Sequence, residues 1–133
     1  MTTPRLGSTA VIILSFILLS LSAPAPANAD MAGHGGMVRA IDVSPDGARV
    51  LTGSFDFTAR LWDFVEQTEI GVLDAHAGPV TNVAFLPDGV RALTTSDDKT
   101  AILWDLKTLK PLKRLIGHGH KVMGLAVSAG GRL

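Results

Sequence analysis

The chain has 133 residues, which is enough for one domain. Its twelve basic and twelve acidic side chains cancel, so nothing in the charge balance points to nucleic acid or to an acidic membrane surface. Cysteine is absent from the sequence, which excludes disulfide bridges, thiolate metal sites, a cysteine nucleophile and a C-x-x-C-H haem attachment.

Residues 1–29 have the pattern of a secretory signal peptide. Arg5 supplies the positive start, Val11 to Leu21 form an apolar run, and Ala27-Asn28-Ala29 is an A-x-A cleavage signature. An uncleaved membrane anchor is the alternative. A spanning helix needs about 20 apolar residues, whereas this run is shorter and contains serine.

The sequence therefore predicts cleavage between Ala29 and Asp30 and export across the inner membrane, with the periplasm as the expected compartment. Removal of residues 1–29, which include Arg5, leaves a mature chain, 30–133, whose net charge is close to zero. We expect this mature chain to have no membrane span.

The rest of the sequence repeats itself. His34, His76 and His118 recur at a constant spacing of 42 residues, and the hexapeptide ending at Trp62-Asp63 returns at Trp104-Asp105. Periods of about 40–45 residues are typical of four-stranded propeller blades. We therefore expect one blade over 34–75, a second over 76–117 and an incomplete third over 118–133.

Within each period the residues predict four strands. In chain order the expected first blade has strands at 38–43, 50–54, a third ending at Trp62-Asp63, and 70–73. The second has strands at 80–85, 92–96, a third ending at Trp104-Asp105, and 111–116, and a further strand is expected at 122–127. Pro-Asp-Gly follows the first strand of both blades. This tripeptide predicts a turn, because proline presets φ, aspartate bonds local backbone and glycine accepts a positive φ. The predicted fold class is all-β, a partial propeller of two complete antiparallel blades and the first strand of a third.

These motifs resemble those of WD40-repeat proteins, here of a secreted bacterial type. They comprise the glycine-histidine element (Gly33-His34 and Gly117-His118), an S-x-D-x-T turn (54–58 and 96–100) and the closing Trp-Asp pair. The second repeat departs from the pattern, with Ala75 in place of the glycine before its histidine.

The resemblance implies a buried hydrogen-bonded tetrad in each blade, made by the loop histidine, a second-strand hydroxyl, the turn aspartate and the tryptophan. The first tetrad would consist of His34, Thr52, Asp56 and Trp62, and the second of His76, Thr94, Asp98 and Trp104. His118 would begin a third set.

Three other readings of these residues compete with the tetrad. Histidine, a hydroxyl and aspartate could form a hydrolase triad, but the set occurs twice at equal spacing and no G-x-S-x-G context is present. His118-Gly119-His120 and the Met31/His34/Met37 stretch are incomplete metal sites, since metals need three or four ligands held in geometry. The pair Asp97-Asp98 fits a hairpin turn better than an acid/base couple. We therefore expect that the chain is not an enzyme and that it binds no cofactor and no metal.

Two surface features could contact a partner. Phe55 and Phe57 flank the turn aspartate of the first blade, where packing over the blade edge competes with a binding role. The basic cluster is a solvated edge or a docking patch for an acidic partner, and it comprises Lys107, Lys110, Lys113, Arg114 and Lys121. The aromatic interleaving expected of single-stranded nucleic-acid sites is absent.

Two stacked blades leave two apolar faces without a neighbour, and propellers have four to eight blades. We therefore expect either a fragment of a longer propeller or several copies that assemble to complete the ring. The resemblance implies a non-catalytic scaffold for a protein partner in the export compartment. The alternatives are the propeller part of a periplasmic assembly associated with cytochrome c, or a truncated product without function.

Overall fold

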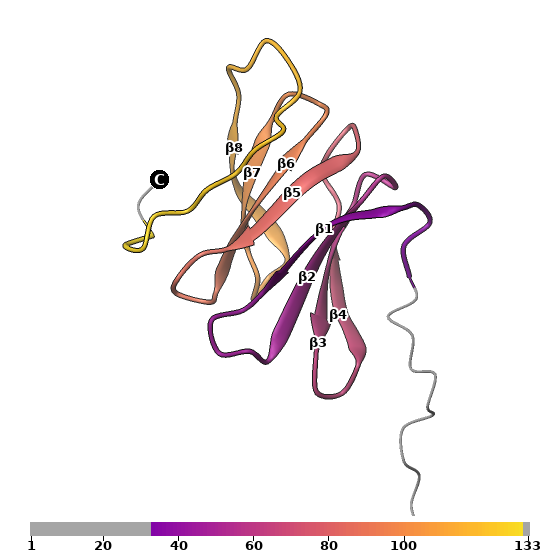
Figure 1. Ribbon diagram of the computed structural model, residues 1–133, viewed down its shortest axis with the longest axis vertical. Helices are drawn as coiled ribbons and strands as arrows, with labels where there is room; N and C mark the ends of the chain where they lie inside the picture. Colours follow the sequence, from indigo (N-terminus) through magenta and orange to yellow (C-terminus); the bar gives the residue numbers. More distant parts are fainter. Residues whose placement is uncertain (1–32, 132–133) are drawn as a thin grey trace, which may run out of the picture. The chain divides into compact units, whose positions relative to one another are not determined.

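The computed structural model describes residues 33–131 (Figure 1). The expected signal peptide, the Ala29/Asp30 cleavage point and Met31 lie outside the described residues. Residues 33–131 form strands and turns, and they include no helix long and apolar enough to cross a membrane.

The first blade is an antiparallel sheet whose four strands follow one another in the chain. They are β1 (Val38–Val43), β2 (Arg49–Ser54), β3 (Ala59–Asp63) and β4 (Thr68–Leu73). The second blade has the same order, with β5 (Val80–Phe85), β6 (Arg91–Ser96), β7 (Ala101–Asp105) and β8 (Lys110–Leu115). The predicted all-β class with two four-stranded blades is confirmed.

The two blades repeat each other in detail as well as in strand order. The ladder shifts register between Leu61 and Trp62 on β3, and at the matching place between Leu103 and Trp104 on β7. Gly47 and Gly89 hold the same turn position with φ of 74° and 68°, which glycine adopts without steric cost. The second and fourth strands begin one or two residues before their predicted starts, as expected when strand ends are judged from side-chain pattern alone.

The main core lies between the two blades. β1 and β2 of the first blade lie beside β5 of the second (Figure 1). Leu51, Leu61 and Leu73 from one side meet Val83, Phe85 and Trp104 from the other, in one buried cluster. Each of these side chains contributes about 1.5–3 kcal/mol on burial, so this interface dominates the packing.

The third repeat differs from the expectation. Residues 122–127 follow an extended course but form no strand, because they share no ladder with any described strand. Two side chains of β5 hold the segment instead: Oγ1 of Thr81 donates to the carbonyl of Val122 at 2.6 Å, and Nδ2 of Asn82 donates to that of Met123 at 2.8 Å. Leu125 and Val127 pack against a second buried cluster of Leu86, Leu93, Ala101 and Leu103.

Candidate functional site

The structure brings the four expected side chains of the second blade together. His76 lies in the loop before β5, Thr94 on β6, Asp98 in the β6–β7 turn and Trp104 on β7. The Nδ1 atom of His76 is 2.8 Å from Oδ2 of Asp98, and its Nε2 atom is 2.7 Å from Oγ1 of Thr94. Nε1 of Trp104 donates to the same Thr94 oxygen at 2.8 Å.

The first blade holds the equivalent set at nearly equal distances. Nδ1 of His34 is 2.8 Å from Oδ2 of Asp56, and Nε2 of His34 is 2.7 Å from Oγ1 of Thr52. Nε1 of Trp62 donates to Oγ1 of Thr52 at 2.8 Å. The indole also lies edge-on to the imidazole, with ring centroids 6.4 Å apart.

The chemistry of the groups fixes the direction of the hydrogen bonds in the second blade. Burial alone would raise the pKa of Asp98, but hydrogen bonds from Thr100, Ala77 and His76 outweigh it and lower the pKa to about 2. The carboxylate is therefore ionised and only accepts, so Nδ1 of His76 carries the proton and donates.

Burial lowers the pKa of His76 below its ordinary value of 6.5, against the opposing effect of Asp98. The ring is therefore neutral near pH 7, and its Nε2 atom accepts from the hydroxyl of Thr94. Trp104, Thr94, His76 and Asp98 thus form one chain in which each proton points toward the carboxylate.

Each turn aspartate has donors that the sequence reading did not name. Oδ1 of Asp98 accepts from the hydroxyl of Thr100 at 2.7 Å and from its backbone N–H at 2.9 Å, while Oδ2 accepts from the N–H of Ala77 at 3.0 Å. Thr58 and Gly35 bind Asp56 in the same way. The threonine at the end of the S-x-D-x-T motif was the signal for these bonds, since it recurs in both turns.

The hydroxyls of the two sets are closed to a substrate. Thr52 is 6% exposed and Thr94 is fully buried, and the tryptophan that donates to each is buried as well. A nucleophile must reach a carbonyl carbon from an open side, and here the indole covers that approach.

The other histidine candidates stand apart from the tetrads. His118 is exposed and has no interaction partner within 33–131. No group of three or more histidine, aspartate or glutamate side chains that could hold a metal lies in the described part of the chain.

The acidic pair Asp97-Asp98 divides its roles. Asp98 belongs to the tetrad, whereas Oδ2 of Asp97 binds Nζ of Lys121 at 2.9 Å. The two carboxyl groups therefore have different partners and do not act as a couple.

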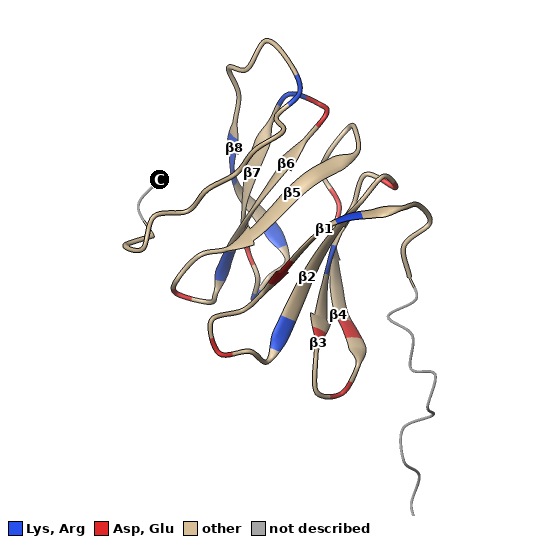
Figure 2. Ribbon diagram, viewed as in Figure 1, with Lys and Arg blue, Asp and Glu red and all other residues tan. Residues whose placement is uncertain are grey.

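The basic cluster is distributed over two structural settings. Arg114 donates to the carbonyl of Ala75 at 2.5 Å and lies 3.7 Å from Oδ2 of Asp98, so it ties β8 to the tetrad loop. Lys110 and Lys113 are exposed on β8 (blue in Figure 2). The matching strand β4 carries the acidic Glu69 instead, ion-paired with Arg60.

The aromatic pair beside the first tetrad is also split. Phe55 is half-buried, with the guanidinium of Arg39 5.4 Å from its ring centroid. Phe57 is 45% exposed and has a positive φ of 75°. The equivalent position in the second blade is Lys99, with φ of 73°.

Comparison with known proteins agrees with this geometry. A stretch of 46 residues is 44% identical to the small ribosomal subunit protein RACK1z of Oryza sativa subsp. japonica. The match covers 35% of this chain and 14% of that protein, so the chain corresponds to a small part of that relative's length.

The family model described as "WD domain, G-beta repeat" matches residues 28–63 and 67–105, which together are more than half of the chain. These two matches end at Asp63 and Asp105, the last residues of β3 and β7. The chain therefore belongs to the WD40 family, the WD-domain, G-beta repeat proteins.

Proposed function

We propose that this chain is a non-catalytic protein-interaction scaffold that acts after export, in the periplasm. WD40 repeats generally serve as platforms for protein partners. The observation that carries the proposal is an exposed phenylalanine, Phe57, at the tip of a turn that the first tetrad fixes from beneath.

The Phe57 turn is rigid although it is exposed. Asp56, its neighbour, accepts hydrogen bonds from the backbone of Gly35 and Thr58 and from the side chains of His34 and Thr58. Because the loop is already ordered, a partner that binds it loses little conformational entropy.

The turn requires a left-handed conformation at position 57, as at Lys99 in the second blade, but it does not require a phenylalanine there. A left-handed backbone is unfavourable by about 1–2 kcal/mol for a residue with a side chain, and aromatic side chains at exposed positions are enriched at binding surfaces. The same turn in the second blade carries Lys99, so the phenylalanine is not needed to build the turn. We infer that its ring is a contact for an apolar patch on a protein partner.

The tetrads have a structural role in this proposal. Their hydroxyls are buried under tryptophan, and the same set occurs in both blades at the same distances. A brace is needed once per blade, whereas a catalytic site is needed once per enzyme.

The proposed periplasmic location is based on the signal-peptide pattern of residues 1–29. The test is to isolate the chain from the periplasmic fraction of an expressing bacterium and read its N-terminus, which we expect to be Asp30. A chain that stays in the cytoplasm with Met1 intact contradicts the proposed location.

The contact role of Phe57 is tested by substituting a photo-crosslinking amino acid at position 57 in the exported chain. Position 65, whose valine is 76% exposed, is the control. We expect one protein band crosslinked at 57 and not at 65. Phe57→Lys, which copies the second blade, should keep the fold. It should lower the amount of the same partner protein that is pulled down with the chain roughly tenfold. Equal capture by the Phe57→Lys chain would show that the scaffold binds elsewhere.

A further inference from the structure

The first blade exposes large apolar side chains on the face that points away from the second blade. β1 contributes Val38 at 49%, Ile41 at 67% and Val43 at 51% exposure, and Phe64, just after β3, is 54% exposed. The alternate β1 residues face the second blade: Ala40 packs on the main core, and Oδ2 of Asp42 accepts from the N–H of Phe85 at 2.7 Å. The four exposed side chains are called the open face of blade 1.

The equivalent residues of the second blade indicate the role of this face. The residues at the same positions in the second blade are Val80, Val83, Phe85 and Leu106, with exposures of 0%, 8%, 6% and 4%. All four belong to the core between the blades. The open face of blade 1 therefore has the composition of an interblade surface but lacks a cover among the described residues.

The internal interface also identifies the surface that such a face fits. The second blade packs on Leu51, Ala59, Leu61 and Leu73 of the first. Gly53 lies between them, and a Cβ atom there would be 2.7 Å from Val80 and 2.9 Å from Val83. A fitting partner thus offers leucines at these positions and a small residue in the middle.

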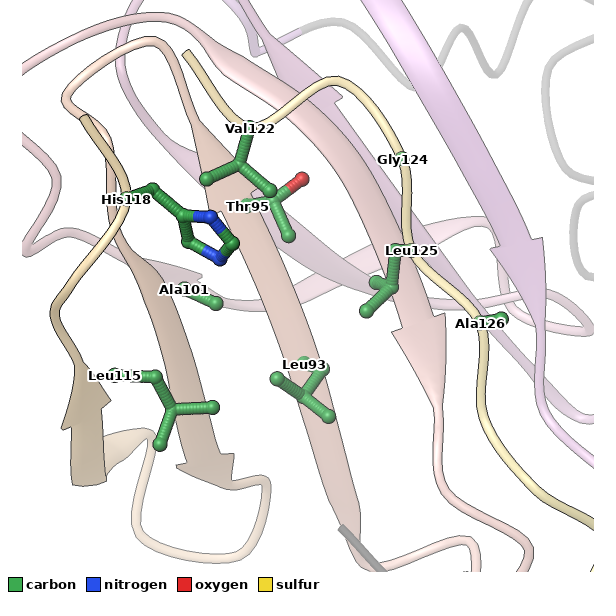
Figure 3. A pocket seen from close by; sticks show the side chains of 9 residues that line it. All are labelled: Leu93, Thr95, Ala101, Leu115, His118, Val122, Gly124, Leu125 and Ala126. Atoms are coloured by element: carbon green, nitrogen blue, oxygen red, sulfur yellow. The ribbon is translucent and has the colours of Figure 1, made fainter. Parts of the chain in front are cut away.

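This chain carries a second surface of the same kind, on the far side of blade 2. The residues that match Leu51, Ala59, Leu61 and Leu73 are Leu93, Ala101, Leu103 and Leu115. The first three belong to the second cluster, and Leu115 packs against it. In the described chain, Leu125 and Val127 of the segment 122–127 pack on this surface, and His118 lies beside it. The cover is incomplete, because a pocket of about 370 Å³ remains between Leu93, Leu115 and this segment (Figure 3).

The covering segment is a copy of β1. Val122, Leu125 and Val127 match Val38, Ile41 and Val43 in spacing and in kind, and Leu125 and Val127 pack on the second cluster. The segment forms no ladder and is held through Thr81, Asn82 and the N–H of Val122. The site on blade 2 therefore accepts side chains like those of β1, and no strand follows the segment within the described residues.

We propose that the open face of blade 1 docks on the far side of blade 2 in a second copy of this chain, where β1 takes the place of residues 122–127. Phe64 and the strands behind β1 then fill the pocket that the segment leaves. The contact is heterologous, so repeated docking generates a ring where the rotation closes.

Two polar positions fit this docking. Thr95 stands where the first blade has Gly53, but it already accommodates Val122, and its Oγ1 atom is 2.8 Å from that of Thr81. Arg60 stands where the second blade has Ile102, which is fully buried in the core between the blades. The docking therefore encloses Arg60 together with Glu69, its ion-pair partner, while the apolar contact runs along β1 and Phe64.

The test uses the absence of cysteine from the chain. One tagged chain carries Ile41→Cys and a second, differently tagged chain carries Thr95→Cys, the pair that matches Val83 and Gly53. The recovered full chains are mixed and oxidised. The control replaces Ile41→Cys with Val90→Cys, since Val90 is a 54% exposed residue in the β5–β6 turn, away from either face. We expect the Ile41 pair to form a mixed disulfide at least roughly tenfold faster than the control pair.

A second measurement separates docking from chance collisions. Val43→Glu places a carboxylate in the proposed contact and should weaken association, followed by native mass against concentration, by roughly a hundredfold or more. Val90→Glu has the same chemistry at similar exposure and should leave association unchanged. A chain that stays monomeric, mixed disulfides at the control rate, or equal effects of the two glutamates would each overturn the proposal and leave the face to another segment or another protein.

Discussion

Nε1 of Trp104 donates a 2.8 Å hydrogen bond to Oγ1 of Thr94, and both side chains are almost fully buried. The same hydroxyl lies 2.7 Å from Nε2 of His76. One threonine therefore links the core indole of the second blade to the loop that enters it.

Removing this hydroxyl should destabilise the blade. Thr94→Val keeps the shape of the side chain but leaves the Trp104 N–H and Nε2 of His76 without a partner. We expect the free energy of unfolding to fall by about 2–3 kcal/mol, measured as a lower urea midpoint with an unchanged m-value. Thr94→Ser, which keeps the hydroxyl, should recover most of the loss. Equal loss in both variants would show that packing, and not the hydrogen bonds, carries the effect.

The architecture could be predicted from the sequence because the same local patterns recur in each repeat. A β-branched run, a Pro-Asp-Gly turn and a closing Trp-Asp pair each determine a short segment, and their recurrence determines the sheet order. The eight side chains that the family resemblance implied for the two tetrads lie within hydrogen-bonding distance of one another in the structure.

Other features depend on contacts that no short pattern encodes. The extended course of 122–127 was predicted as a strand, yet a strand requires a neighbour, and the described chain brings none to it. Arg114 was grouped with surface lysines, but its distance to Ala75 and Asp98 arises only when β8 folds beside the loop. Ile41 and Val83 hold the same position in the two blades. Ile41 is exposed and Val83 is buried, because only the face that carries Val83 packs against another blade in the described chain.

Acid should weaken the second tetrad. The pKa of Asp98 falls from 3.8 in the unfolded chain to about 2 in the fold, so its contribution is present above pH 4 and is lost as the pH falls from about 4 to 2. The folded pKa of His76 is also lowered, so protonation of the unfolded chain reduces stability as the pH falls below 6.5. We expect urea midpoints to decrease steadily from pH 7 to pH 2.

Asp98→Asn separates the two groups. This variant should be less stable than the parent at pH 7 by about 2 kcal/mol, from the pKa difference, and the gap should close near pH 2. Its remaining pH dependence between pH 7 and pH 5 reports on other groups, His76 among them. A gap that stays constant across the range would contradict the lowered pKa.

Glycine at position 99 should stabilise the β6–β7 turn. Lys99 is exposed and holds a φ of 73°, which costs about 1 kcal/mol for any residue with a Cβ atom. Lys99→Gly removes this cost but makes the unfolded chain more flexible, so we expect a net gain of a few tenths to about 1 kcal/mol. Lys99→Ala retains the Cβ atom and should show no such gain in thermal unfolding, and a gain of the same size in Ala would attribute the effect to the lost charge.

Gly53 is a position where the two blades approach closely. An added Cβ atom would be 2.7 Å from Cγ1 of Val80 and 2.9 Å from Cγ1 of Val83, and branched side chains on a strand have little freedom to move aside. Gly53→Ala should therefore lower the free energy of unfolding by about 1–3 kcal/mol, although alanine is normally favoured over glycine within a strand. Gly119→Ala, where a Cβ atom meets nothing within 4 Å, is the matched control and should leave stability unchanged. The urea midpoints of both variants decide the matter: a Gly53→Ala chain as stable as the control would show that the blades can separate slightly at no cost, and that the interface is less tightly packed than these distances indicate.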